Sequence, residues 1–132
     1  MIPKYRAWDK EFKEMVQVDA LVFDEQIIKA TYKNGNVVKE DLKNYVLMQS
    51  TGLGDKNGRE IFEGDIIAIN LEGLETPITA KVFQNRKIGI LMFHAFEDNE
   101  DVPMVELLEG DSVEFAIIGN IWENPELLEV RT

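Results

Sequence analysis

The stretch "IIKATYKNGNVVKE", residues 27–40, decides the fold class of this chain. Two runs rich in β-branched residues flank the dipeptide Asn34-Gly35, which is suited to the two positive φ angles of a type I′ turn. The stretch therefore predicts a β-hairpin with a two-residue turn, and it is the strongest local signal in the sequence.

Alternating apolar runs recur along the rest of the chain. They are "GDIIAINL" (64–71), "TPITAKVFQ" (76–84), "KIGILMFHAF" (87–96) and "EFAIIGNIW" (114–122), and each predicts a strand. Asn85 favours a tight reversal between the second and the third of these runs. Residues 76–84 and 87–96 are therefore expected to form a further hairpin.

Helical signals are scarce and short. One turn is expected within "VKEDLKNYVLM" (38–48) and another within 103–110, with Pro103 at its first position and Gly110 at its end. Asn124 is suited to cap a short helix that begins at Pro125. The predicted fold is mainly β with few short helices: an N-terminal β-hairpin region over 1–46, then a small SH3-like β-barrel over 47–132.

Composition limits the classes of partner. The chain has 132 residues, enough for one domain, and a net charge of −11, which opposes binding to nucleic-acid phosphate and to anionic membranes. The absence of cysteine excludes disulfides and thiolate chemistry. No run of signal-peptide or bilayer-spanning length is present, so we expect a cytoplasmic protein without a cofactor.

The excess of acid lies in the second half of the chain. Residues 67–132 hold 4 basic and 13 acidic groups, against 10 and 12 in residues 1–66. The simplest interpretation of the acidic loop 97–114 is a solvated surface, and the alternative is a face that imitates nucleic acid toward a basic partner. Weak cation binding by Asp98, Glu100 and Asp101 is a lesser alternative. The carboxylates of the possible partner-binding face are Glu97, Asp98, Glu100, Asp101, Glu106, Glu109, Asp111 and Glu114.

The glycine-rich stretch "TGLGDKNGREIFEGD" (51–65) looks most like a ligand site, but each ligand pattern fails. A Walker loop needs a Lys after its last glycine, and Gly58 is followed by Arg59. A dinucleotide loop needs a helix next, whereas the following residues alternate like a strand. A calcium loop that begins at Asp55 would place Arg59 at a ligand position. A double turn that leads into a strand remains.

Other chemically capable residues favour structural interpretations. His94, the single histidine, lies between apolar neighbours and no orienting acid can be assigned to it from the sequence. Trp8 and Trp122 are expected in the core. Met92, Phe96 and Met104 are candidates for an exposed patch that would support a homo-oligomer.

Three blocks in order resemble the YopX family of phage and prophage proteins: "YRAWD", "MQSTGLGDKNGREIFEGDII" and "IIGNIWENPELL". Gly54 departs from the pattern, which has a polar residue there, and an extra glycine is expected to loosen the turn. The positions that match the family signature are Arg6, Trp8, Asp9, Thr51, Gly52, Leu53, Asp55, Gly58, Ile61, Gly64, Asp65, Gly119, Asn120, Asn124, Pro125 and Glu126.

The resemblance implies an SH3-type barrel in the C-terminal region, a phage accessory origin and no transferable catalytic residue. The leading hypothesis is a non-enzymatic interaction module that binds an unidentified protein, and self-association into a homo-oligomer is a further expectation. The alternatives are an acidic, nucleic-acid-mimicking inhibitor of a host DNA-binding protein and, below it, a hydrolase or metal-dependent enzyme built around His94.

Overall fold

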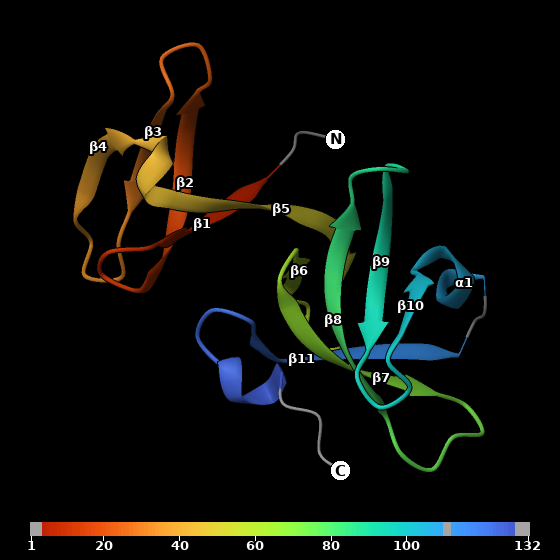
Figure 1. Cartoon of the computed structure of the whole chain (residues 1–132). Helices are drawn as coiled ribbons and strands as arrows, with labels where there is room; N and C mark the ends of the chain where they lie inside the picture. The colour runs from red at the N-terminus through yellow and green to blue at the C-terminus, as the bar shows by residue number, and fades with distance from the viewer. Residues whose placement is uncertain (1–3, 110–111, 129–132) are drawn as a thin grey trace. The chain divides into compact units, whose positions relative to one another are not determined.

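The computed structural model describes residues 4–109 and 112–128, and the prediction of a mainly β fold with few short helices is confirmed (Figure 1). The strands form two antiparallel sheets. The chain divides into two compact units, Met1–Ser50 and Thr51–Thr132, called unit 1 and unit 2 below.

Unit 1 is built from antiparallel strands. These are β1 (Tyr5–Asp9), β2 (Glu14–Val22), β3 (Ile27–Thr31) and β4 (Val37–Asp41), followed by the 3-10 turn η1 (Leu42–Asn44) and the first half of β5 (Tyr45–Gly54). The hydrogen-bonded order of the sheet is β4-β3-β2-β1-β5-β6. The core of the unit consists of Ala7, Val16, Ile28, Ala30 and Tyr45.

The predicted hairpin over 27–40 is present, but its turn is not of type I′. Gly35 donates to the Tyr32 carbonyl at 2.9 Å, and Tyr32 donates to the Asn36 carbonyl at 2.8 Å, which makes a three-residue loop. Gly35 has a φ of +91°, whereas Asn34 is not among the residues with positive φ. The Asn34 side chain instead accepts from the N–H of Asn36 at 2.9 Å, so one glycine supplies the left-handed position that closes the loop.

Unit 2 contains the end of β5, then β6 (Glu60–Phe62), β7 (Asp65–Leu71), β8 (Ile78–Asn85), β9 (Ile90–Ala95), β10 (Glu100–Pro103), α1 (Val105–Leu108), β11 (Val113–Asn120) and η2 (Pro125–Leu128). The four strands expected from alternation are confirmed, as is the hairpin of β8 with β9. The core of this unit includes Ile61, Ile67, Val82, Phe93 and Phe115.

The five-stranded sheet of unit 2 has the order β10-β9-β8-β7-β11. Within the described residues no strand pairing joins β10 to β11, so the sheet is open at both edges. This part of the chain is therefore an antiparallel meander of four strands, with the fifth strand returning beside the first.

The short helices fall where they were expected, with one local correction. Pro103 ends β10 opposite Met92 and does not begin α1, because an edge strand tolerates the missing N–H of proline. Asn124 directly precedes η2, which begins at Pro125 as expected, and its side chain accepts from the N–H of Asn120 at 3.1 Å. Gly110 lies outside the described residues. No helix in the described part of the chain is long and apolar enough to span a bilayer.

Candidate functional site

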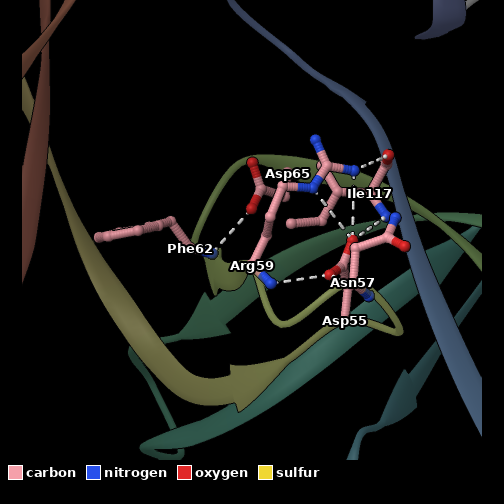
Figure 2. A network of polar contacts seen from close by, with 6 residues as sticks. All are labelled: Asp55, Asn57, Arg59, Phe62, Asp65 and Ile117. Carbon is pink, nitrogen blue, oxygen red and sulfur yellow. Dashed lines mark hydrogen bonds and ion pairs between the residues drawn. The ribbon is translucent and has the colours of Figure 1, made fainter.

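The glycine-rich turn 55–59 is organised around the carboxylate of Asp55, whose side chain is fully buried (Figure 2). Its Oδ1 accepts from the backbone N–H groups of Asn57 and Arg59, both at 2.9 Å. Its Oδ2 accepts from the N–H of Ile117 at 3.3 Å and pairs with the Arg59 guanidinium at 3.2 Å. One carboxylate thereby fixes the turn and ties it to β11, a segment far away in the sequence.

Arg59 completes this clamp. Its Nη2 donates to the carbonyl oxygen of Ile117 at 2.9 Å as well as pairing with Asp55. The backbone N–H and C=O of Ile117 are thus both held by the turn, next to the register shift between Ile117 and Gly119 in the pairing of β11 with β7. β11 is an edge strand of the five-stranded sheet, so its outward backbone groups have no partner strand, and the Asp55–Arg59 pair bonds to those of Ile117.

The electrostatics of Asp55 favour the charged form. Burial by itself raises the pKa of this carboxyl, but the backbone donors at Arg59, Ile117 and Asn57, together with the Arg59 charge, outweigh burial and lower the pKa below its ordinary value. Asp55 is therefore an ionised acceptor whose oxygens are directed at the protein's own donors.

The second half of the stretch 51–65 contains another turn that a buried carboxylate holds. Asp65 is buried, and its Oδ2 accepts from the N–H of Phe62 at 2.8 Å, which fixes the turn between β6 and β7 (Figure 2). Gly64, with φ +86°, donates to the carbonyl of Val82 at 2.9 Å and accepts from the N–H of Ile121 at 2.9 Å. The left-handed angle explains why this position requires glycine.

Thr51 fastens the other side of the same region. Its hydroxyl donates to the carbonyl of Ile61 at 2.7 Å and accepts from the N–H of Leu53 at 3.1 Å. Ile61 is fully buried in the core of unit 2. The short strand β6 is thus held at its backbone by Thr51 and at its side chain by the core.

The C-terminal signature block forms another self-satisfied turn. The Oδ1 of Asn120 accepts from the N–H groups of Trp122 and Glu123, at 3.0 and 2.8 Å, while its amide donates to the Glu123 carboxylate at 2.9 Å. A Cβ at Gly119 would lie 2.6 Å from the Asn124 Oδ1 and 2.9 Å from the Leu127 Cδ1. Glycine is required at position 119 because η2 packs directly onto its backbone.

The N-terminal signature block follows the same pattern in unit 1. Asp9 accepts from the N–H groups of Glu11 and Phe12, at 2.9 and 3.1 Å, and from the Tyr32 hydroxyl at 2.5 Å. Tyr32 shares a further hydrogen bond of 2.6 Å with the hydroxyl of Tyr45. Burial and the hydrogen bond to Asp9 raise the pKa of Tyr32, and burial raises the pKa of Tyr45. Both tyrosines therefore stay protonated and serve as donors.

The buried polar side chains and the signature coincide. Asp9, Asp55, Asp65 and Asn120 are the buried polar or charged residues of the described chain, and all four belong to the signature. Each accepts hydrogen bonds from nearby backbone N–H groups of the same chain. The arrangement can hold turns, and its oxygens are already used for that purpose.

His94 has the partner that sequence reasoning could not assign. Its Nδ1 lies 2.7 Å from the Oδ1 of Asp101, which is directly opposite in the pairing of β9 with β10. The ring also makes an edge contact with Phe96, at a centroid distance of 5.7 Å. No group of three or more His, Cys, Asp or Glu side chains able to hold a metal occurs within residues 4–109 and 112–128. The pair depends on the register of β9 against β10, and the sequence alone does not specify that register.

The acidic residues of 97–114 are spread over several elements. Glu97 and Asp98 precede β10, Glu106 lies in α1, and Glu114 lies on β11 at the opposite edge of the sheet. Neighbouring residues Glu100 and Asp101 point to opposite faces of β10, because side chains alternate along a strand. Glu109 follows α1, and Asp111 is outside the described residues.

The hydrophobic candidates divide differently from the expectation. Met104 is buried in the core of unit 2 and Met92 is also buried, so the expected exposed patch of Met92, Phe96 and Met104 is wrong. Trp8 is buried as predicted, and Trp122 is half-buried.

These features define a class: an antiparallel β protein of two units whose buried polar side chains hold its turns. The chain belongs to the YopX family, because the family model described as "YopX protein" matches residues 4–129. This confirms the resemblance that the three signature blocks indicated.

Two solved structures are similar over nearly the whole chain. The protein EF1440 from Enterococcus faecalis is 30% identical, with 98% of this chain and 99% of that chain covered and a TM-score of 0.57. The protein yopX from Bacillus subtilis is 20% identical, with 95% and 97% covered and a TM-score of 0.60. No curated protein matches the sequence.

Proposed function

We propose that this protein is a non-enzymatic, phage- or prophage-encoded accessory protein that acts by binding another protein in the cytoplasm of the bacterial host. The observation that carries the proposal is that the buried polar side chains are already engaged in hydrogen bonds within the chain. In the described chain Asp9, Asp55, Asp65 and Asn120 hold turns, whereas exposed apolar side chains such as Val22 and Val37 lie on strands. Polar atoms engaged in the fold are poor candidates for chemistry, and exposed strand surfaces suit protein binding.

We also propose that unit 2 is an SH3-type small barrel. Support comes from its strand order, because a four-strand meander whose fifth strand returns beside the first is the connectivity of that fold. The short helix α1 between β10 and β11 fits the same connectivity. SH3-type barrels host many binding functions, so the fold permits a binding module without specifying the partner.

A nucleic-acid mimic is the second candidate, and one observation favours it. Unit 1 holds 8 basic and 8 acidic side chains, whereas unit 2 holds 6 and 17, so the whole net charge of −11 belongs to unit 2. A mimic needs carboxylates arranged along one surface, and Glu100 and Asp101 point to opposite faces. Asp101 is moreover engaged by His94, which makes this candidate weaker than the general binding module.

An enzyme built around His94 is the third candidate. Its support is the His94–Asp101 contact of 2.7 Å, which provides an orienting acid. A hydrolase would also need a nucleophile or a metal, and no metal-holding group of side chains occurs in the part of the chain that the structure describes. A His94→Ala variant that retains full partner binding would support the binding module over this candidate.

Affinity capture from host cells that express the tagged full-length chain tests the proposal. We expect a reproducible host or phage protein, identified by mass spectrometry, that also binds when both proteins are purified. The control is Asp55→Ala, which disrupts the turn 55–59. A protein that this variant captures equally well binds unfolded chain and does not count as a partner. Repeated capture without a partner that binds in purified form would contradict the proposal.

A further inference from the structure

One face of the unit 1 sheet combines apolar residues with two lysines. The residues that line a hollow of about 400 Å³ on this face are Ala20, Val22, Ile27, Lys29, Val37, Val38 and Lys39. Val22 is 40% exposed and Val37 is 57% exposed, so these strand residues face solvent. We call this surface the lysine face.

The two lysines lie directly opposite each other in the pairing of β3 with β4. Like charges in this position destabilise a sheet. Neither the Lys29 nor the Lys39 side chain makes a hydrogen bond or an ion pair with any other described residue. The sheet therefore holds two adjacent positive charges whose repulsion its own residues do not relieve.

The acids nearest to these lysines in the register are engaged elsewhere. Asp41 accepts from the N–H of Lys43 at 3.0 Å and lies 3.7 Å from its ammonium group. Asp19 accepts from the Thr31 hydroxyl at 2.5 Å and from the Gln17 amide at 2.9 Å. An external carboxylate would supply the counter-charge that the face lacks.

The lysine face ends at an open strand edge. β4 is the outer strand of its sheet (Figure 1). The hydrogen bonds from Tyr32 to Asn36 and from Leu42 to Gln26 fix which β4 residues bond to β3, because bonded and non-bonded pairs alternate in an antiparallel ladder. Val37, Lys39 and Asp41 are in non-bonded pairs, so their N–H and C=O groups point away from β3.

The same residues thus present both outward backbone groups and side chains on one face. A strand added antiparallel to β4 would bond to Val37, Lys39 and Asp41 and extend the row Ala20–Lys29–Lys39 by one side chain. Opposite Lys39 that side chain is best an acid, and opposite Val37 it is best a β-branched apolar residue.

We propose that β4 binds an extended peptide segment of a partner protein with the pattern acid-x-apolar, paired antiparallel to the strand, with the acid over Lys29 and Lys39. This inference rests on the proposed binding function and specifies its surface and the chemistry of its partner. The two lysines lack a counter-charge, which favours an acidic partner. The open edge of β4 favours an extended one.

The test uses the full chain and a labelled synthetic peptide, Thr-Thr-Glu-Thr-Val-Thr, with a Gln-for-Glu peptide as the matched probe. We expect saturable binding in fluorescence anisotropy that weakens with salt and is weaker for the Gln peptide. Amide exchange at Val37, Lys39 and Asp41 should slow when the peptide binds, because their N–H groups gain partners.

Charge reversal locates the site. The double variant Lys29→Glu/Lys39→Glu should lose about tenfold or more in peptide affinity, since both attractive charges become repulsive. It keeps a like-charged opposite pair, so its melting temperature should stay near that of the native chain. Lys56→Glu/Lys87→Glu in unit 2 changes the net charge equally and should leave affinity within about twofold.

Three results would overturn the inference: equal binding of both peptides, protection outside β4, or equal loss in the two double variants. A concentration-dependent dimer that the Lys29→Glu/Lys39→Glu variant abolishes would also overturn it, because a second copy would then occupy the edge. If a partner captured from host cells binds the Lys29→Glu/Lys39→Glu variant undiminished, the inference fails while the proposed function stands.

Discussion

At the scale of single residues, buried acceptors decide the shape of the turns. Asp9, Asp55, Asp65 and Asn120 each bind backbone N–H groups within four positions in sequence. A short polar side chain in this position competes well with water because the chain already holds donor and acceptor close together. The place of these four residues in the signature is therefore explained by folding, without reference to a ligand.

Asp55 gives the first prediction. Because its folded pKa is lowered below the unfolded value of about 3.9, the ionised form adds stability that is present above that value and is lost as pH falls through the folded pKa. Asp55→Asn should lower the melting temperature at pH 7, and the difference from the native chain should shrink toward about pH 2.

Thermal melts of both proteins across this pH range provide the measurement. Asp24→Asn, at an exposed position, is the control and should leave the melting temperature nearly unchanged at every pH. A difference for Asp55→Asn that does not change with pH would show that the charge of Asp55 contributes no stability.

Gly54 gives the second prediction. Its φ is not positive, and a Cβ there would meet only the Arg59 carbonyl at 3.8 Å. Gly54→Ala should raise the free energy of unfolding by about 0.5 kcal/mol, because it reduces the freedom of the unfolded chain.

Gly58 is the matched control, since it has a φ of +80° in the same turn. Gly58→Ala should lower the free energy of unfolding by roughly 1–2 kcal/mol, because a side chain disfavours the left-handed region. Urea titration measures both variants, and a Gly54→Ala chain less stable than native would contradict the expectation that the extra glycine loosens this turn.

At the scale of elements, short strands are held by contacts from distant parts of the sequence. The three-residue strand β6 depends on Thr51 for its backbone and on the core for Ile61. β11 is held at Ile117 by the Asp55–Arg59 pair, 58 or more positions away in sequence. These elements form because contacts with distant parts of the chain stabilise them. Three residues alone cannot form a stable strand.

Ile61 gives the third prediction. Its side chain is fully buried, so Ile61→Ala should lower the free energy of unfolding by about 2–5 kcal/mol, through lost burial and the cavity that remains. Ile118→Ala is the matched control, because Ile118 is 44% exposed on β11 and should cost much less. Equal losses in urea titration would show that β6 does not anchor the core.

At the scale of the whole molecule, charge separates the two units. Unit 1 is electrically neutral and unit 2 carries the net charge of −11. Charge of this kind acts at a distance and affects association more than folding. The lysine face of unit 1 is therefore notable as a positive, apolar surface in a chain whose overall charge would repel acidic partners.

The fourth prediction follows from this charge. The full chain should not shift duplex DNA in a gel mobility assay at physiological salt. Its acidic residues repel phosphate, and it has few basic side chains that could displace counterions from the DNA. A retarded band whose affinity falls with increasing salt would contradict it, and the same assay with a basic DNA-binding protein is the positive control.

Much of the fold was predictable from local patterns, and the candidate site was predictable only in part. The mainly β class, the hairpins over 27–40 and 76–96 and the short helical turns followed from alternation and turn residues. The turn at Asn34-Gly35 was predicted with the wrong type. The Asn34 side chain accepts from the N–H of Asn36 and so stabilises the three-residue loop in place of the two-residue turn.

The sequence by itself determined the strands, the glycine turns and the family, because alternation and left-handed glycines are local properties that neighbours in the chain express directly. Only the tertiary structure decided that Met104 is buried, that His94 meets Asp101, that Arg59 holds Ile117 and that Lys29 opposes Lys39. These contacts depend on the register between strands, and a register is set by the packing of a whole sheet.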